Sequence, residues 1–276
     1  ILIGLVGSEM CIRDRSYTNS CFSEHIASSI FRMLSIRAQE TMLGTFQVSG
    51  KTKVVCACRD FTADGKLFYD FCSIKNTILD SEHGGTGTEL SDIMESIEKQ
   101  QFVNPVILKE HFWKMFVVDA FLGNFDRHNG NWGFLYDPDS QKAEIAPIFD
   151  CGSCLLPQAD EKVMERILHD ENELNARIFQ FPTSAVKLEG KKIRYYDFLM
   201  SGQSEDCNEA LIQIVPKIHV ETIQNFLEEV PYLSDLQRTF YLTYIQARLE
   251  KLLLPAYKQA VSQKDDMTLS SKEPIQ

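Results

Sequence analysis

Residues 123–152 read GNFDRHNGNWGFLYDPDSQKAEIAPIFDCG, and this stretch decides the fold of the chain. It begins with Asp126 and, five positions later, Asn131, and it closes with Asp150-Cys151-Gly152. Between these motifs, Trp132–Tyr136 and Ala143–Phe149 have the composition of strands, joined by a turn-forming run of Asp, Pro and Ser. Such a hairpin returns the chain to where it started, so we expect the two aspartates to meet at one site.

The two motifs are typical of phosphoryl transfer to a hydroxyl group. In a D-x-x-x-x-N loop the Asp accepts the hydroxyl proton and the Asn holds a metal ion, and in a D-x-G segment the Asp bridges Mg²⁺ to nucleotide phosphates. Mg²⁺ needs one or two protein carboxylates besides phosphate oxygens, which suits Asn131 and Asp150. Either motif alone arises by chance in most proteins of this size. Here the first motif follows a long apolar helix and the second follows a predicted hairpin. This combination is specific for a phosphoryl-transfer site.

At these residues the sequence resembles the HipA-like serine/threonine kinases, including their shorter stand-alone relatives. The resemblance covers roughly residues 20–260, and it is weaker at Ser23-Glu24 and Val54–Phe61. The positions that carry it are Asn124, Asp126, Arg127, His128, Asn131, Gly133-Phe134 and Pro147–Asp150.

The resemblance implies an α+β, protein-kinase-like bilobal fold with an incomplete N-lobe and a mainly helical C-lobe. It implies transfer of the ATP γ-phosphoryl group to Ser or Thr of a protein, with Asp126 as catalytic base and Mg²⁺ held by Asn131 and Asp150. A DNA-binding antitoxin, as in toxin–antitoxin pairs, is a further implied partner. The residues implied to contact the nucleotide are the hinge Ala57, Cys58, Arg59 and Asp60, together with His128, Asn129, Asn131 and Phe149.

The sequence departs from the family before its first predicted helix. There the family has a glycine-rich loop and a phosphate-binding lysine, of which only Tyr17–Ser20 could remain, and Lys51 and Lys53 follow the helix instead. Glu24 on this helix could pair with the missing lysine or face solvent. We therefore expect an N-terminally truncated protein, and whether this fragment is active stays open.

Outward from the motifs, apolar spacing predicts the surrounding elements. It predicts a helix from Phe22 to Leu34, a hairpin of Thr45–Val48 and Lys53–Ala57, a flexible loop over 80–88, and a helix over 105–122. From about residue 158 the pattern is mainly helical. The last helix begins at a Ser234-x-x-Gln237 capping box, and Pro255 is expected to kink or end it.

Four regions follow from this pattern. Residues 1–15 (ILIGLVGSEMCIRDR) resemble the translated read-through of a sequencing adaptor, so we expect them to be non-native. Residues 16–61 are the expected N-lobe remnant of helix, hairpin and hinge, and 62–261 the helical C-lobe with both loops. Residues 262–276 are polar and without periodicity, which predicts a disordered tail.

Composition narrows the function classes. The 276 residues include 28 Lys and Arg against 39 Asp and Glu, a net charge of −11 that disfavours direct binding to nucleic acid or anionic membranes. Eight cysteines at irregular spacing are too sparse for a secreted disulfide framework and fit a reducing cytosol, so we expect a cytoplasmic protein.

Alternative interpretations stay open at this point. D-R-H-x-x-N followed by D-x-G also resembles the phosphatidylinositol kinases, and a catalytically dead nucleotide-binding pseudokinase would keep the same metal motif. Gly44–Thr52 nearly matches a phosphate loop, but one residue too many favours a hairpin turn. Cys56 and Cys58 with Cys151 and Cys154 could form a zinc site, although packing thiols are favoured.

Overall fold

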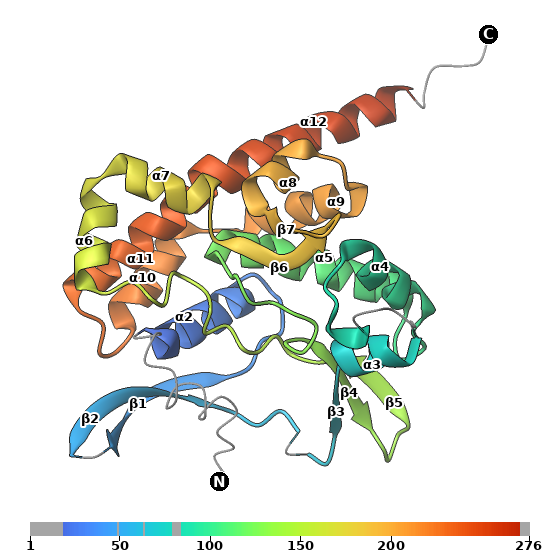
Figure 1. The fold of residues 1–276 in the computed structure, drawn as a ribbon, viewed down its shortest axis with the longest axis horizontal. Helices are drawn as coiled ribbons and strands as arrows, with labels where there is room; N and C mark the ends of the chain where they lie inside the picture. The colour runs from blue at the N-terminus through green and yellow to red at the C-terminus, as the bar shows by residue number, and fades with distance from the viewer. Residues whose placement is uncertain (1–18, 49, 63, 79–83, 271–276) are drawn as a thin grey trace.

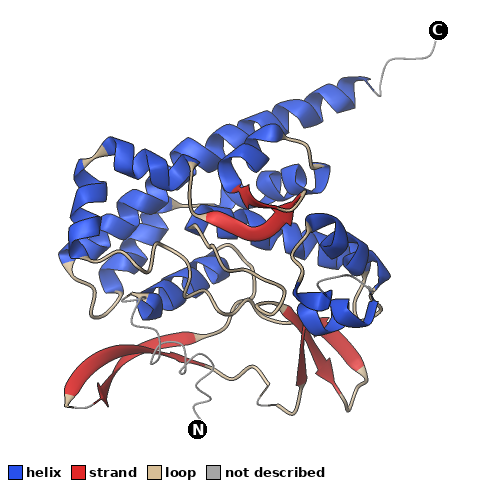
Figure 2. Cartoon of the chain, viewed as in Figure 1, coloured by secondary structure: helices blue, strands red, loops and turns tan. Residues whose placement is uncertain are grey.

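The computed structural model describes residues 19–270 apart from 49, 63 and 79–83. A body of packed helices carries two small sheets along one side, and a third hairpin lies against the helical body in front of it (Figures 1 and 2). The expected non-native segment 1–15 lies outside the described residues.

Helix α2 (Ser20–Met33) lies between the first hairpin and the helical body (Figure 1). Its apolar side chains at helical spacing, including Ile26 and Ile30, are fully buried, as predicted. Strands β1 (Thr41–Val48) and β2 (Lys51–Cys58) pair antiparallel, from Thr41 opposite Cys58 to Val48 opposite Lys51. The hairpin interpretation of this segment is therefore confirmed, and the phosphate-loop alternative is excluded.

The second sheet joins strands that are distant in sequence. Its order is β3 (Leu67–Asp70), β4 (Gly133–Asp137) and β5 (Lys142–Ile145), all antiparallel. The β4–β5 hairpin was predicted, whereas β3 was not. A side chain at Gly133 would place its Cβ 2.2 Å from the Tyr69 carbonyl oxygen, so a glycine is required where β3 and β4 come together.

Helix α5 (Pro105–Leu122) forms the centre of the core and matches the predicted boundaries. Asn104 caps its start by accepting the Val106 N–H, and Gly123 ends it at φ 67°. The helices that surround α5 before the C-terminal ones are α3 (Phe71–Ile78), α4 (Leu90–Lys99), α6 (Glu161–His169), α7 (Glu171–Phe179), α8 (Tyr195–Ser201), α9 (Glu205–Ile214) and α10 (Val220–Glu229), with the short 3₁₀ helices η1 (Gly84–Thr86) and η2 (Val215–Lys217).

The region after residue 158 is mainly helical as predicted, but it also contains an unpredicted hairpin. Strands β6 (Thr183–Leu188) and β7 (Lys191–Arg194) are joined by Glu189 and Gly190, which both have positive φ. Two consecutive residues of this kind form the tight turn whose twist matches a hairpin. Glutamate is an unusual residue at positive φ, which is why the pattern was not recognised.

The C-terminal helices pack back onto α5. Helix α11 (Asp235–Arg248) begins at the predicted capping box. The hydrogen bonding then changes to a π-helix, η3 (Leu249–Leu253), immediately before the proline near the start of α12 (Leu254–Ser270). The fully buried Arg248 donates from Nε to the Ala120 carbonyl oxygen at 2.8 Å and from Nη1 to that of Arg177 at 2.7 Å.

The prediction of disorder from residue 262 is wrong as far as Ser270, because α12 continues to that residue. The helix is held by contacts with α9, among them Gln263 Oε1 with Asn208 Nδ2 at 3.0 Å and Lys264 Nζ with Glu209 Oε2 at 2.7 Å. Residues 271–276 lie outside the described part of the chain.

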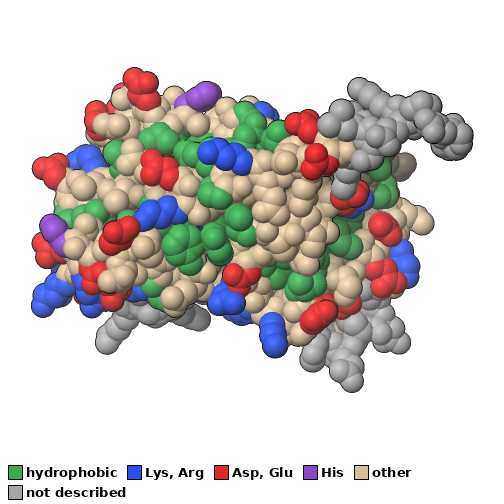
Figure 3. Space-filling view, turned by 90° about the horizontal axis from the view of Figure 1, so that it is seen from above, with side chains coloured by type: hydrophobic (Ala, Val, Ile, Leu, Met, Phe, Trp, Pro, Cys, Tyr) green, Lys and Arg blue, Asp and Glu red, His purple; other side chains and the backbone are tan. Residues whose placement is uncertain are grey.

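The surface seen from above carries basic and acidic side chains in mixture, with apolar groups between them (Figure 3). Within the described ranges, every helix lacks the length or the apolarity that crossing a membrane requires.

Candidate active site

The first predicted loop leaves the end of α5 and is fixed from its first residue. Asn124 is buried, and its Nδ2 donates to Asp119 Oδ1 on α5 at 2.8 Å. Its Oδ1 accepts the backbone N–H of Asp126 at 2.9 Å. The buried amide thus connects the helix directly to the predicted catalytic aspartate, whose side chain is half-buried.

The rest of this loop closes on itself through the same aspartate. The Asp126 carbonyl oxygen accepts the N–H of His128 at 2.8 Å and Nδ2 of Asn131 at 2.9 Å. His128 is exposed and Asn131 is buried. Because the amide nitrogen of Asn131 is used inside the loop, its Oδ1 is the atom that could bind a cation.

The second motif lies beside this loop. Asp150 is half-buried and has φ 53°, a left-handed conformation that is strained for a residue with a side chain and that is found at functional sites. Burial raises the pKa of Asp150 above its ordinary value; the Arg127 guanidinium lowers it, the Asp126 carboxylate raises it further and His128 lowers it. Asp150 is therefore within electrostatic reach of the first loop, as the hairpin predicts.

A buried arginine joins the two motifs. Arg127 donates from Nε to Asp119 Oδ2 at 3.0 Å and from Nη1 to the carbonyl oxygen of Asn131 at 2.9 Å. The same Nη1 donates to the carbonyl oxygen of Phe149, the residue before Asp150. One guanidinium thus contacts both loops. The sequence identified Arg127 by resemblance alone and assigned it no role.

Glu24 on α2 contacts the second motif from the other side. Its carboxylate accepts the backbone N–H of Cys151 and lies 3.3 Å from the Ser28 hydroxyl. Burial, and secondly the Asp150 carboxylate, raise its pKa to about 7. The alternative that Glu24 faces solvent is therefore wrong. A Cβ at Gly152 would lie 2.6 Å from Ser20 Oγ, so this segment passes close to the start of α2.

The predicted hinge spans the end of β2 and the residues after it, and it is anchored to the segment that precedes β1. Arg59 donates its backbone N–H to the Glu40 carbonyl oxygen at 2.8 Å, and its own carbonyl oxygen accepts Gln39 Nε2 at 2.9 Å. Ala57 and Cys58 end the paired strand. The Asp60 carboxylate accepts the N–H and the hydroxyl of Thr62, so it shapes the turn after the hinge.

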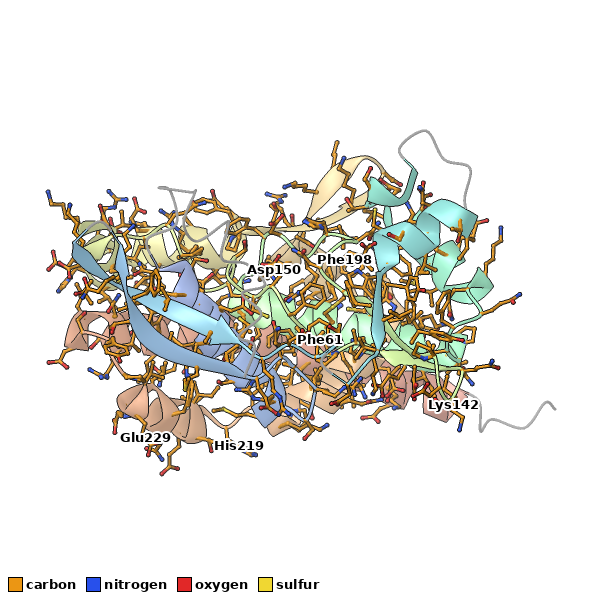
Figure 4. The ribbon with its side chains drawn as sticks, turned by 90° about the horizontal axis from the view of Figure 1, so that it is seen from below. Phe61, Lys142, Asp150, Phe198, His219 and Glu229 are labelled. Carbon is orange, nitrogen blue, oxygen red and sulfur yellow. The ribbon has the colours of Figure 1, made fainter. Side chains whose placement is uncertain are left out.

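An aromatic cluster connects the hinge to the second motif. The ring of Phe149 lies 5.6 Å from that of Phe61 and 5.3 Å from that of Phe68, which are 5.7 Å apart. Phe61 and Asp150 lie near the middle of the face seen from below, while Lys142 and Glu229 lie towards its ends (Figure 4). The sequence indicated Phe149 as a nucleotide contact but indicated no role for Phe61 or Phe68. The feature that could have revealed them is a pair of phenylalanines on either side of a short polar loop.

Asn129 contacts the glycine-rich turn instead of remaining open. Its Nδ2 donates to the carbonyl oxygens of Gly85 and Gly87, both at 2.8 Å. The fully buried Lys75 also donates to Gly87, at 2.7 Å. The prediction of a flexible loop is therefore wrong for 84–88, where these bonds fix the backbone, and residues 80–83 lie outside the described ranges. Contact of Asn129 with a nucleotide stays a prediction.

Other candidate sites find less support. Over the described residues, the structure contains no group of three or more His, Cys, Asp or Glu side chains suited to a metal ion, so the four-thiolate zinc alternative fails. Cys151 and Cys154 are buried thiols. A cavity of about 550 Å³ opens between α5 and β5, and none of the candidate residues lines it.

Known proteins resemble this chain in sequence and in fold. The family model described as "HipA-like C-terminal domain" matches residues 7–222. The serine/threonine-protein kinase CtkA of Helicobacter pylori strain J99 is 46% identical over 250 residues, which cover 90% of this chain and 76% of the relative. A crystal structure of the H. pylori proinflammatory kinase CtkA superposes with a TM-score of 0.86 at 45% identity, covering 90% of this chain and 89% of the other.

A more distant structure shares the fold. It is HipA of Shewanella oneidensis MR-1, determined in complex with HipB and operator DNA, with a TM-score of 0.54 at 15% identity. The superposition covers 86% of this chain and 57% of the other, and it concerns the fold alone.

Proposed function

The chain belongs to the family of HipA-like C-terminal domains, and from that premise we propose that it transfers the γ-phosphoryl group of ATP to a Ser or Thr hydroxyl of a protein substrate. The expected resemblance and the α+β, kinase-like fold are confirmed. Similarity to a named serine/threonine kinase over 90% of the chain supports the transferase activity.

One observation carries the assignment of roles. Arg127 follows Asp126 in the first loop and donates to the residue that precedes Asp150 in the second. Two carboxylates whose segments are both bonded to one guanidinium can take different roles in phosphoryl transfer. The half-buried Asp126 would accept the proton of the attacking hydroxyl, while Asp150 would face the phosphates.

The residues present fit a magnesium ion. The amide oxygen of Asn131 and the carboxylate of Asp150 are hard oxygen ligands, and phosphate oxygens and water complete such a site. Bound Mg²⁺ would neutralise charge on the β- and γ-phosphates. This chain's own contribution is to hold Asn131 by its bond to the Asp126 carbonyl oxygen and Asp150 by its segment's bonds to Arg127 and Glu24.

The adenine base would bind between the hinge and the aromatic cluster. At the hinge, the N–H and carbonyl of Arg59 are already bonded to Glu40 and Gln39, so the other peptide groups of 57–60 would contact the base. Phe61, Phe68 and Phe149 offer ring faces and edges. His128 is exposed beside Asp126 and would contact the phosphates.

Partners follow from the same premise. A protein with an accessible Ser or Thr is the proposed substrate. A DNA-binding antitoxin, which the family resemblance implies, is the second candidate partner. The described cysteines are free thiols, in keeping with a reducing, cytoplasmic location.

The role of Asp126 is tested by following transfer from labelled ATP in the full-length protein. A base acts in the transition state, so Asp126→Ala should keep ATP affinity within a few-fold while lowering transfer by ~10²–10⁴. Asp139→Ala, an exposed aspartate in the β4–β5 turn, is the matched control. Unchanged transfer in folded Asp126→Ala would remove the base from the proposal.

Calorimetry together with the transfer assay separates the metal site from the base. Asp150→Asn should abolish Mg²⁺-dependent ATP binding measured by calorimetry, because it removes the carboxylate that faces metal and phosphates. Asn131→Ala should lower transfer more than nucleotide affinity, since water can replace a neutral ligand. A parent that binds MgATP but transfers nothing to any protein would favour the pseudokinase alternative.

A further inference from the structure

The guanidinium of Arg127 lies at the junction of three segments. It is 4% exposed and donates to Asp119 on α5, to the Asn131 carbonyl oxygen at the end of the catalytic loop, and to the Phe149 carbonyl oxygen. It also lies 3.4 Å from the sulfur of Cys151, measured from Nη2. The donors of a guanidinium form a rigid planar fork, so these acceptors are held in one fixed arrangement.

Asp119 anchors this fork and the other end of the catalytic loop. It is 1% exposed and accepts Arg127 Nε at Oδ2 and Nη2 at Oδ1, at 3.0 and 3.3 Å. Its Oδ1 also accepts Asn124 Nδ2, and Asn124 in turn accepts the N–H of Asp126. The backbone of Asp126 is therefore fixed to α5 from both directions along the chain.

Burial and pairing act in opposite directions on the charges of Asp119 and Arg127. Burial works against the charged guanidinium, yet the Asp119 carboxylate raises the pKa of Arg127 above its ordinary value. Burial raises the pKa of Asp119, and the facing guanidinium counteracts that rise. A buried ion pair adds little net stability compared with apolar side chains of the same size, so stability alone gives a weak reason for this arrangement.

We propose that Arg127, anchored by Asp119, is a positioning residue that sets the separation between the base Asp126 and the metal-binding Asp150. This inference rests on the proposed function and adds a role for two residues that do not touch the reacting atoms. Arg127 holds the backbone on either side of the transfer site, at Asn131 and at Phe149. A shift of about 1 Å between reacting groups costs ~10²-fold in rate.

Arg127→Lys is the direct test, because it keeps the charge and removes the fork. In the folded variant at saturating Mg²⁺, the turnover number for transfer from labelled ATP to a mixed protein substrate should fall by ~10²-fold, while the KM for ATP changes by less than a few-fold. Calorimetry should also show that half-maximal ATP binding requires severalfold more Mg²⁺, with unchanged ATP affinity in its absence. Arg37→Lys is the control, because Arg37 is an exposed arginine that pairs with Glu144 away from the site. It should alter neither the turnover number nor the Mg²⁺ requirement.

Asp119→Asn tests the same link without altering the guanidinium. It keeps the shape of the side chain and should reproduce both the lower turnover and the higher Mg²⁺ requirement. Either variant, folded and with parental turnover and parental Mg²⁺ requirement, would overturn the positioning role. If neither variant gives a folded protein by thermal unfolding, the pair is structural and the proposal is also overturned.

Failure of the proposed function would look different. A parent without phosphoryl transfer would contradict the kinase activity, yet the Mg²⁺ dependence of ATP binding would still report whether Arg127 controls the placement of Asp150.

Discussion

At the scale of single residues, the spacing of polar side chains identified the candidate site but not the buried residues that hold its loops in place. Asp126, Asn131 and Asp150 were predicted because they lie within one local stretch of chain. Asp119 and Glu24 were given no such support role, because their contacts with the loops exist only after α5 and α2 have packed. A carboxylate on an apolar helix gives no sequence signal of the partner it will meet.

Glu24 makes the stability of the metal-free protein depend on pH. Burial raises its pKa from 4.5 to about 7, so between these values the folded chain keeps a proton that the unfolded chain has lost. The contribution of Glu24 to the free energy of unfolding is therefore complete below pH 4.5 and is lost as pH rises through about 7. Between these values the free energy of unfolding falls by at most ~1.4 kcal/mol per pH unit.

Glu24→Gln should flatten this decline, because the amide does not titrate. Denaturant unfolding of parent and variant at several pH values between 5 and 7, with chelator present, measures the difference. Glu229→Gln, on the exposed face of α10, serves as control and should keep the parental slope. If the free energy of unfolding fell equally with pH in the parent and in Glu24→Gln, this carboxyl group would not be the source of the pH dependence.

At the scale of elements, prediction succeeded where the pattern was local. Helix α5 carries its own cap, proline and terminal glycine, and the two hairpins beside the site contain their own turns. Strand β3 has only four residues and is defined by pairing with β4, more than 60 positions later. The glycine-rich turn over 84–88 is likewise ordered by distant partners, Asn129 above all.

Gly85→Ala should destabilise this turn and the protein with it. A Cβ at Gly85 would lie 1.8 Å from the Cys72 carbonyl oxygen, so the backbone must move and lose its bonds to Asn129. We expect a loss of ~1–3 kcal/mol in the free energy of unfolding, measured in denaturant. Gly44→Ala is the matched control, since its Cβ would meet no atom within 4 Å. Equal stability of both variants would contradict the structural role of the turn.

At the scale of the whole molecule, the charge distribution bears on the substrate. The net charge is −11, and the face seen from above mixes both signs (Figure 3). A protein that works on lipid head groups gains from a basic surface, because anionic membranes attract it by about 1 kcal/mol per nearby Lys or Arg. The fold class followed from the resemblance, whereas the packing of the C-terminal helices on α5 required the structure, since neither partner shows it in sequence.

We therefore predict that the protein does not adhere to vesicles containing phosphatidylserine and phosphatidylinositol phosphates, even at low salt. Cosedimentation at two ionic strengths measures this, with neutral phosphatidylcholine vesicles as the control. Adhesion to the anionic vesicles that weakens as salt rises would favour the phosphatidylinositol-kinase alternative.

The contact of Arg248 with α5 has a consequence for how the protein is made. Its side chain binds the Ala120 carbonyl oxygen, 128 positions earlier in the chain, at the end of the helix that leads into the catalytic loop. During synthesis the helix emerges from the ribosome long before its partner does, at roughly 5–20 residues per second. The support beneath the proposed catalytic loop is completed only after Arg248 has emerged, so the candidate site stays unfinished until late in translation.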